Sequence, residues 1–352
     1  MNPRVERLRA GLDSLGAASF LVTRPVNVRY LTGFESSNAA LAVGADRLVL
    51  ATDGRYVEAA RELGGVEVVQ AERDLLAWLG ERLGELAVAP VAFEADHITV
   101  AGHRSLAAGG VELVPTTEVV VGLRAVKDGE ELAAVRRAAR VTDDAYARLA
   151  QEPLVGRTEA EVAWWLERAL RDEGADRLAF PPIVASGPNA ALPHHHPGPR
   201  RIGAGETVIV DAGAQVGGYC SDCTRTFATG PLPDELQRAY ALCRSAQETS
   251  LAAVRAGAVA SELDGIARSR IEESGLAPVL HGLGHGVGLE VHELPVLRPS
   301  SPEALAAGNV VTVEPGVYLA GRGGVRIEDL VVVGANGPEV LSSFTKDLLT
   351  LD

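Results

Sequence analysis

The sequence predicts an α+β protein of two domains, in which the first domain is a compact α/β unit. Short β-branched runs alternate with amphipathic helical stretches over about the first 120 residues, and grouped helices and then grouped strands follow them. The chain has 352 residues, a length that favours two domains with room for a core in each.

The elements expected in the first domain alternate between helix and strand. Val5, Leu8, Leu12 and Leu15 recur with helical spacing and predict an opening helix at residues 3–15. The elements expected after it are strands at 19–23, 39–43 and 47–51, a helix at 55–63, a strand at 66–69, a helix at 74–86, a strand at 88–93, a helix at 99–108 and a strand at 111–114. No glycine-rich phosphate-binding loop occurs among them.

A change of pattern near Val121 sets the expected boundary, with domains at 1–123 and 124–352. One long amphipathic helix is expected from there to about Ala150. Two further long helices are expected at about 234–255 and 261–274, and the chain is β-rich from Val310 onward.

A capping box formed by Thr158 and Glu161 predicts the start of another helix, which ends near Gly174. This helix carries Trp164 and Trp165, which we interpret as core residues rather than as a platform for a ligand.

Composition excludes several classes of partner. The net charge of −14, without any run of Lys or Arg, argues against binding to nucleic acid. No apolar run is long enough to span a membrane and the first residues lack a signal-peptide core, so a cytoplasmic enzyme without a membrane partner is expected. Cys220, Cys223 and Cys243 are odd in number, and the first two point to opposite faces of a strand, so no disulfide framework is expected.

Residues 207–226 predict two strands joined at Gly217-Gly218, because β-branched runs lie on either side of a turn signal. In this register Asp211 lies opposite Thr224, and Asp222 lies opposite Gly213.

Asp211 and Asp222 then share one face of the hairpin as diagonal neighbours, about 7–8 Å apart at the backbone. Two carboxylates so placed repel each other unless something positive lies between them, and a divalent metal ion or a pair of ions is the natural candidate. The alternative is that both aspartates are solvated on a surface strand, although aspartate is poorly suited to strand interiors.

Three later segments supply further candidate ligands. Residues 281–293 hold four glycines at alternate positions, which forbid a stable helix and permit close approach of backbone. His281 and His285 would face one side of this extended segment, whereas His292 needs a turn to join them. The other two segments place Glu314 before a proline, and Arg326 two positions before Glu328 on the same strand face.

Each of these residues taken singly reads more readily as a satisfied core residue, and only the set supports a site. Carboxylates at Asp211, Asp222, Glu314 and Glu328 with one imidazole make an oxygen-rich site for two ions. Such ligands suit Mn²⁺ or Co²⁺, with Zn²⁺ also possible, better than a thiolate-bound structural zinc ion.

The ordered set Asp211, Asp222, His285, Glu314 and Glu328 resembles the ligand set of the pita-bread metallopeptidases: methionine aminopeptidase, aminopeptidase P and prolidase. The surrounding motifs resemble the proline-specific branch of that family; they lie at 221–226 (SDCTRT), 284–288 (GHGVG), 313–316 (VEPG) and 325–329 (VRIED). The resemblance covers the chain from about residue 125 to the end. The first ~120 residues are similar, more weakly, to the creatinase-type N-terminal domain, so the resemblance implies an N-terminal α/β domain followed by a pita-bread catalytic domain.

The resemblance implies roles for the five ligands. Asp222 binds both metals, Asp211 chelates one, His285 completes the shell of one and Glu328 bridges the two. Glu314 is both a ligand and the general base.

Further residues match positions that contact the substrate or brace the site in the family. They are His194, His281, His292 and Arg326. His195 and His196 depart from the usual pattern of the family, so the assignment of His194 is ambiguous. The alternative for the three consecutive histidines is a solvated loop, since proline and glycine surround them.

The resemblance implies hydrolysis of the imide bond in a small peptide with proline in second position. A prolidase acts on dipeptides and must read the free carboxylate of the proline, most plausibly with an arginine such as Arg298 or Arg47. An aminopeptidase P acts on longer peptides and leaves that end open. A non-catalytic peptide-binding relative is the remaining alternative, disfavoured because all five ligands are present.

Such enzymes usually form homodimers, which gives the N-terminal domain a possible role at a neighbouring subunit. Residues 32–38 form a loop rich in glycine and small polar residues that could cap the neighbour's site, where Glu35 would meet the substrate amine and Arg29 or Arg47 its carboxylate. The alternative is an ordinary surface turn.

Overall fold

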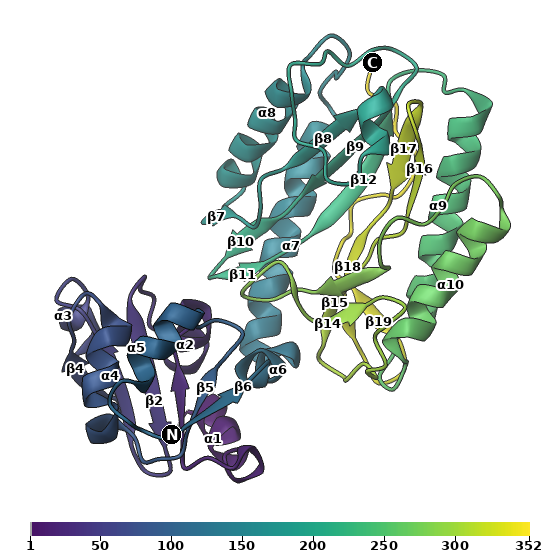
Figure 1. Ribbon diagram of the computed structural model, residues 1–352. Coiled ribbons are helices and arrows are strands. Elements are labelled where there is room, and N and C mark those ends of the chain that lie inside the picture. The colour runs from purple at the N-terminus through teal and green to yellow at the C-terminus, as the bar shows by residue number, and fades with distance from the viewer. Residues whose placement is uncertain (1) are drawn as a thin grey trace. The chain divides into compact units, whose positions relative to one another are not determined.

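The computed structural model describes residues 2–352 and confirms the α+β class (Figure 1). It divides into two compact units, one up to Arg124 and one from Ala125 to Asp352. Across residues 2–352 no helix has the length and apolar character that crossing a membrane requires.

The first unit is built on a six-stranded sheet in the order β4-β3-β2-β1-β5-β6. The strands are β1 (Ser19–Val22), β2 (Ala39–Gly44), β3 (Leu48–Thr52), β4 (Glu67–Gln70), β5 (Val91–Glu94) and β6 (Leu113–Thr116). Strand β2 runs antiparallel to both its neighbours, and the remaining pairs are parallel.

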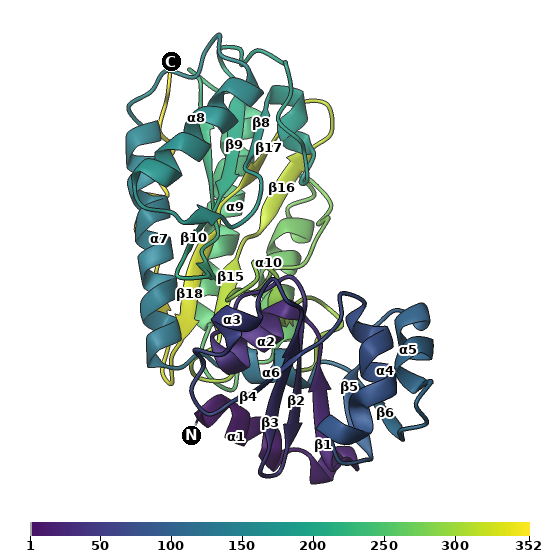
Figure 2. The same cartoon turned by 90° about the vertical axis from the view of Figure 1, so that its left-hand side faces the viewer.

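The helices of this unit are α1 (Pro3–Ala10), α2 (Pro25–Thr32), α3 (Val57–Ala60), α4 (Leu75–Leu86), α5 (Val100–Ala107) and α6 (Val119–Ala125). Helices α4 and α5 pack on each other and α4 packs on the sheet, as Figure 2 shows. The two helices approach closely at Gly80, where a Cβ atom would lie 2.0 Å from the carbonyl oxygen of Ser105. The expected helix at 55–63 is shorter, because only Val57–Ala60 is α-helical.

Helix α2 was not among the expected elements. The two residues before it are held by the buried carboxylate of Glu94 on β5, which accepts hydrogen bonds from the backbone amides of Thr23 and Arg24 at 2.7 and 2.8 Å. The sequence did hold local signals for this helix, in Pro25 at its first position and in Gly33, which is left-handed just after its end.

The first half of the second unit packs two helices, α7 (Gly129–Leu149) and α8 (Glu159–Asp172), against a sheet of β8 (Ile183–Ser186), β9 (Thr207–Ala212) and β12 (Cys223–Ala228). A smaller sheet holds β7 (Arg177–Leu178), β10 (Ala214–Val216) and β11 (Tyr219–Cys220). The expected single helix up to Ala150 is two helices, because Asp128 caps α7 in a capping box with Glu131.

The interpretation of the two tryptophans on α8 is wrong for one of them. Trp165 packs at the edge of the core, with the guanidinium of Arg148 over its ring at 5.7 Å. Trp164 is 63% exposed, because it lies on the helix face that carries charged residues. The capping box of Thr158 and Glu161 at the start of α8 is confirmed.

The second half of this unit packs α9 (Asp234–Ala253) and α10 (Ala260–Glu273) on a sheet in the order β14-β13-β15-β18-β19. These strands are β13 (Gly284–Gly286), β14 (Glu293–Leu297), β15 (Val310–Val313), β18 (Asp329–Val333) and β19 (Pro338–Val340). A two-stranded ribbon of β16 (Gly316–Leu319) and β17 (Gly323–Arg326) completes it. In Figure 1, α7 and α8 flank one side of the strands of this unit, and α9 and α10 the other.

Candidate metal centre

The expected hairpin register is confirmed. Asp211 on β9 pairs with Thr224 on β12, and beyond a break the pairing continues between β10 and β11. The turn lies at Gly217 and Gly218, whose φ angles of 60° and 88° suit glycine. At the break Gly213 touches the opposite backbone so closely that a Cβ atom would lie 2.0 Å from the carbonyl oxygen of Ser221. The adjoining Asp222 lies between the two ladders, outside any strand.

The glycines around His285 permit the close backbone approach that the sequence predicted. A Cβ atom on Gly284 would lie 2.2 Å from the carbonyl oxygen of Thr312 on β15, and one on Gly286 would lie 2.2 Å from that of Leu294. The register shifts between His285 and Gly286, so β13 carries a bulge that aims the imidazole.

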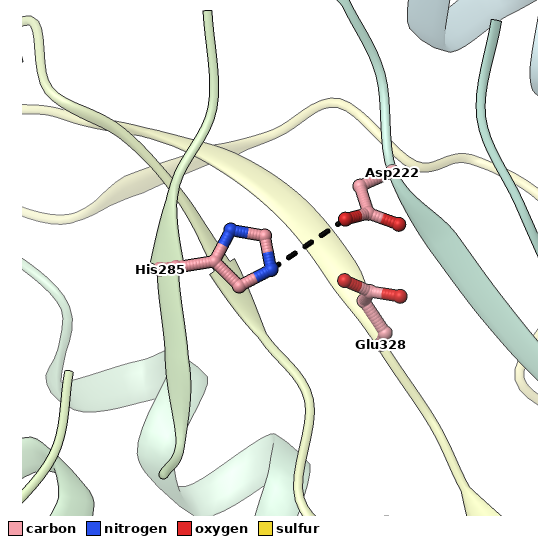
Figure 3. A group of neighbouring side chains, drawn as sticks. All are labelled: Asp222, His285 and Glu328. Atoms are coloured by element: carbon pink, nitrogen blue, oxygen red, sulfur yellow. Dashed lines mark ion pairs between the residues drawn. The ribbon is translucent and has the colours of Figure 1, made fainter. Parts of the chain in front are cut away.

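Three side chains form a compact cluster, drawn in Figure 3: Asp222, His285 and Glu328. One possible ligand atom from each lies within 4.8 Å of the others, and His285 Nε2 is 3.6 Å from Asp222 Oδ2. The Nδ1–H of His285 donates to the carbonyl of Gly286 at 3.1 Å, which orients the ring so that Nε2 faces the carboxylates.

The other two predicted ligands adjoin this cluster. Glu314 Oε1 lies 3.2 Å from His285 Nε2, and the Thr312 hydroxyl donates to the same oxygen. Asp211 Oδ2 accepts a 2.6 Å bond from Arg326, whereas Asp211 Oδ1 is buried and has no hydrogen-bond partner in residues 2–352. Asp211 influences the charges of Asp222 and Glu328 and is influenced by that of Glu314, so the four carboxylates lie near one another.

The electrostatics of this cluster are governed by burial and by repulsion between carboxylates. Burial, and then repulsion from neighbouring carboxylates, raise the pKa values of Asp222 and Glu328 well above the ordinary range. Burial raises the pKa of Asp211 as well, in spite of Arg326. Burial opposes ionisation of Glu314 too, but its contact with His285 lowers its pKa to about 2, and the pKa of His285 is raised in return.

These residues fit divalent cations. Glu328 Oε1, like Asp211 Oδ1, is buried without a hydrogen-bond partner in the described residues, and such orphaned oxygens are costly unless a cation satisfies them. The donors are carboxylate oxygens with one imidazole nitrogen, a set that suits Mn²⁺, Co²⁺ or Zn²⁺.

Arg326 connects the carboxylate cluster to His281 through a chain of hydrogen bonds. Its guanidinium donates to Asp211, to Thr224 at 3.1 Å and to the hydroxyl of Tyr318 at 3.1 Å. The hydroxyl of Tyr318 in turn lies 2.9 Å from Nε2 of His281, whose Nδ1–H donates to the carbonyl of Gly282. Burial lowers the pKa of His281, so the chain of donors runs from Arg326 through Tyr318 to a neutral imidazole.

Thr224 and Tyr318 were not among the predicted site residues. The hydroxyl of Thr224 accepts a hydrogen bond from Arg326 and donates one to Glu328 Oε2 at 2.8 Å, so it links the guanidinium to this carboxylate. Its position opposite Asp211 was the available signal for this role. Tyr318 stands in an apolar strand, and nothing in its local sequence marks it.

The remaining predicted histidines lie beside the cluster. The ring of His292 is 4.3 Å from that of His285, edge to face, so the expected turn does bring it back. His194 is exposed, and after burial its charge is among the influences that lower the pKa values of His281 and His292, which places it near both.

Three predicted residues have surroundings of their own. Arg298 is exposed just after β14 and beside Gly282, and its guanidinium has no hydrogen bond or ion pair to any of residues 2–352. Arg47 donates to both carboxylate oxygens of Glu67 and to the carbonyl of Glu85 within the first unit. Glu35 lies 3.1 Å from Arg29.

The three cysteines are buried, and none of them forms a disulfide within residues 2–352. The thiols of Cys220 and Cys223 contact the carbonyls of Leu289 and Glu328 respectively, so they do not face each other.

Fold and site together define a metallopeptidase with an additional N-terminal domain. Residues 133–335 match the model of metallopeptidase family M24, and residues 4–126 match the Creatinase/Prolidase N-terminal domain. The chain belongs to metallopeptidase family M24. The resemblance to the proline-specific branch of the pita-bread metallopeptidases is confirmed, and so is the two-domain fold that it implied.

Relatives match over nearly the whole chain. The chain is 33% identical to Xaa-Pro dipeptidase from Pyrococcus furiosus, across 99% of this chain and 100% of that protein. Among solved structures, it is similar to an Xaa-Pro dipeptidase from Bacillus anthracis, with a TM-score of 0.94, 36% identity and 99% of each chain covered. It is also similar to an X-Pro aminopeptidase from Thermotoga maritima, with a TM-score of 0.88, 32% identity and 99% of each chain covered.

Proposed function

We propose that this protein is a dinuclear metal-dependent peptidase that cleaves the Xaa-Pro imide bond of dipeptides, a prolidase. The observation that carries the proposal is the buried group of four carboxylates and His285, in which oxygens of Asp211 and Glu328 lack partners in the described chain. Full-length similarity to Xaa-Pro dipeptidases supports the choice of substrate.

In this proposal the five residues hold two divalent ions. Asp211, Asp222, His285 and Glu328 would serve as ligands, with Asp222 and Glu328 contributing to both ions, and Glu314 would be a ligand that also acts as the base. The bound ions would supply a positive charge that lowers the pKa of a water molecule toward neutrality.

The chain's own residues move the proton and orient the substrate. Glu314 accepts the proton of the attacking water and passes it to the leaving imide nitrogen. Both ring nitrogens of His281 are engaged, by Gly282 and by Tyr318. His292 and His194 have no hydrogen bond to any of residues 2–352, so they are the donors free to stabilise the oxyanion or hold the substrate.

Removal and return of metal tests the cofactor. Protein treated with a chelator should lose Xaa-Pro hydrolysis and regain it with Mn²⁺ or Co²⁺, and elemental analysis should find two ions per chain. Full activity without metal, or one ion per fully active chain, would contradict the dinuclear site.

Substrate length separates the two candidate activities. Arg298 is the favoured reader of the proline carboxylate, because its guanidinium has no partner in the described chain, whereas that of Arg47 is held by Glu67 and Glu85. Ala-Pro should therefore be cleaved much faster than Ala-Pro-Ala. Arg298→Ala should reduce this difference in cleavage rate between the dipeptide and the tripeptide. Arg270→Ala, an exposed position on α10, is the matched control.

The alternative function is that of an aminopeptidase P, favoured by the similarity to the Thermotoga maritima enzyme. Equal cleavage of both peptides by the unmodified enzyme would establish that alternative. The remote alternative, a non-catalytic peptide-binding protein, predicts peptide binding without turnover.

The proposal places the enzyme in the cytoplasm as a homodimer, with domains at 1–123 and 124–352. The loop at 32–38 would then cap a neighbouring site, where Glu35 meets the substrate amine. Sedimentation analysis tests the dimer, and deletion of the loop should narrow the preference for Ala-Pro if the cap exists.

A further inference from the structure

The segment between β8 and β9 carries the three consecutive histidines, which the sequence could not tell apart. It begins with a 3₁₀ turn at Gly187–Ala191. His194 and His196 are exposed, whereas the side chain of His195 is only 15% exposed because it turns toward the start of α8. The three imidazoles therefore stand in different environments.

Glu159, at the first position of α8, is the residue that His195 meets. Its carboxylate is fully buried and accepts hydrogen bonds from both ends of the histidine segment. Oε1 accepts from the amide and hydroxyl of Ser186 at 2.9 and 2.8 Å and from Asn189 at 3.0 Å. Oε2 accepts from Nε2–H of His195 at 2.7 Å and from the amide of Gly198 at 3.3 Å.

A second anchor holds the same segment from the side of the metal centre. Arg326, which donates to Asp211, also donates to the carbonyl of Pro193 at 3.1 Å. His194 thus lies between two fixed neighbours, Pro193 and His195. Its own imidazole has no protein hydrogen bond in residues 2–352 and lies near His281 and His292.

We propose that Glu159 is a positioning residue, which engages His195 and both ends of the segment and thereby presents His194 as the histidine that contacts the substrate. The inference rests on the proposed function for the nature of that substrate. It deepens that function by assigning three different roles: His195 is a structural anchor, His194 a substrate contact and His196 a solvated residue.

A carboxylate is required at this position because every group around it is a donor. Glutamine at 159 would turn an NH₂ group toward the donors of Ser186, Asn189 or His195, and at least one of those contacts would become repulsive. The segment would keep its sequence and the metal ligands would be untouched, but His194 would lose its fixed position.

A double-mutant cycle tests this role through kinetics. His194→Ala should lower kcat/KM about 10²-fold, and Glu159→Gln should lower it by about 10- to 100-fold, because misplacing a contact group by about 1 Å costs that much. Once His194 is alanine, adding Glu159→Gln should cause little further loss, since Glu159 acts through His194. Multiplicative losses in the double variant would overturn the proposal.

Two controls separate positioning from general stability. Asp143 is a buried carboxylate that accepts from Ser343 and Phe344, neither of which belongs to the histidine segment. Asp143→Asn should lower Tm about as much as Glu159→Gln and leave kcat/KM near the unmodified value. His196→Ala should also leave kcat/KM near that value, and a loss as large as that of His194→Ala would overturn the assignment.

Chemical modification of histidine gives a readout that needs no activity. With diethyl pyrocarbonate and mass spectrometry, His194 and His196 should react quickly and His195 slowly, whereas in Glu159→Gln His195 should react as quickly as its neighbours. Equal reactivity of all three in the unmodified protein would overturn the anchor. If the enzyme cleaved no Xaa-Pro peptide, the proposed function would fail, and this protection pattern would still decide the part played by Glu159.

Discussion

Replacing Asp222 by asparagine should change stability in opposite directions with and without metal. In the metal-free protein Asp222 is buried among other carboxylates, and burial and repulsion raise its pKa well above the ordinary value. Replacing this buried carboxylate by a neutral amide of the same shape removes the desolvation and the repulsion, a relief of about 1–3 kcal/mol. For a domain of roughly 200 residues each kcal/mol moves Tm by about 2–4 °C, so Asp222→Asn should raise the Tm of metal-free protein by roughly 2–12 °C.

Adding metal should give the unmodified protein a higher Tm than Asp222→Asn, the reverse of the order expected without metal. A divalent ion at about one hundred times its Kd stabilises the unmodified protein by about 2.7 kcal/mol, which corresponds to a gain of roughly 5–10 °C. Asp222→Asn removes the ligand proposed to touch both ions, so its Tm should change little when Mn²⁺ is added.

Differential scanning calorimetry in chelator and in Mn²⁺ measures both effects. Asp143→Asn is the control, because it removes a buried carboxylate whose oxygens are satisfied by Ser343 and Phe344. It should lower Tm in both conditions and keep the gain from Mn²⁺. The reasoning is refuted if Asp222→Asn lowers Tm in chelator as the control does, or if it gains as much from Mn²⁺ as the unmodified protein.

Three further outcomes are expected. Glu314→Gln should lower kcat by at least ~10²-fold while the folded protein still binds metal, and near-normal turnover would show that another group moves the proton. Arg326→Ala removes the buried partner of Asp211, so metal-free protein should lose about 3–5 kcal/mol in a urea titration, whereas a loss below ~1 kcal/mol would contradict the pairing. Burial raises the pKa of Glu159, but hydrogen bonds led by that of His195 outweigh burial and lower it. The stability that Glu159 contributes is therefore present above its unfolded-state pKa of about 4.3 and is lost as the pH falls through its lower folded-state pKa. In Glu159→Gln the Tm should accordingly fall less steeply over this acid range.

The parts of the site that were predictable are those specified by short stretches of sequence. The register that places Asp211 opposite Thr224 follows from two β-branched runs and the turn at Gly217-Gly218, all within twenty residues. The alternating glycines around His285 likewise predicted that another backbone segment approaches closely, and β15 and β14 do so.

The parts that were missed depend on partners distant in sequence. The residues before helix α2 are held by Glu94 on another element, and the role of Tyr318 appears only when Arg326 and His281 flank its hydroxyl. The three consecutive histidines were equivalent in sequence, and only the buried carboxylate of Glu159 distinguishes His195. In each case the interaction is tertiary, so local pattern could not contain it.

The bond between Thr224 and Glu328 has a consequence for the order of folding. It joins residues 104 positions apart, and the bond from Arg326 to Asp211 spans 115, so a long loop must close before these groups meet. The local β9–β12 hairpin can form well before that closure. We therefore expect a bound cation to stabilise an arrangement absent from the transition state for folding, and to slow the unfolding rate far more than it speeds refolding.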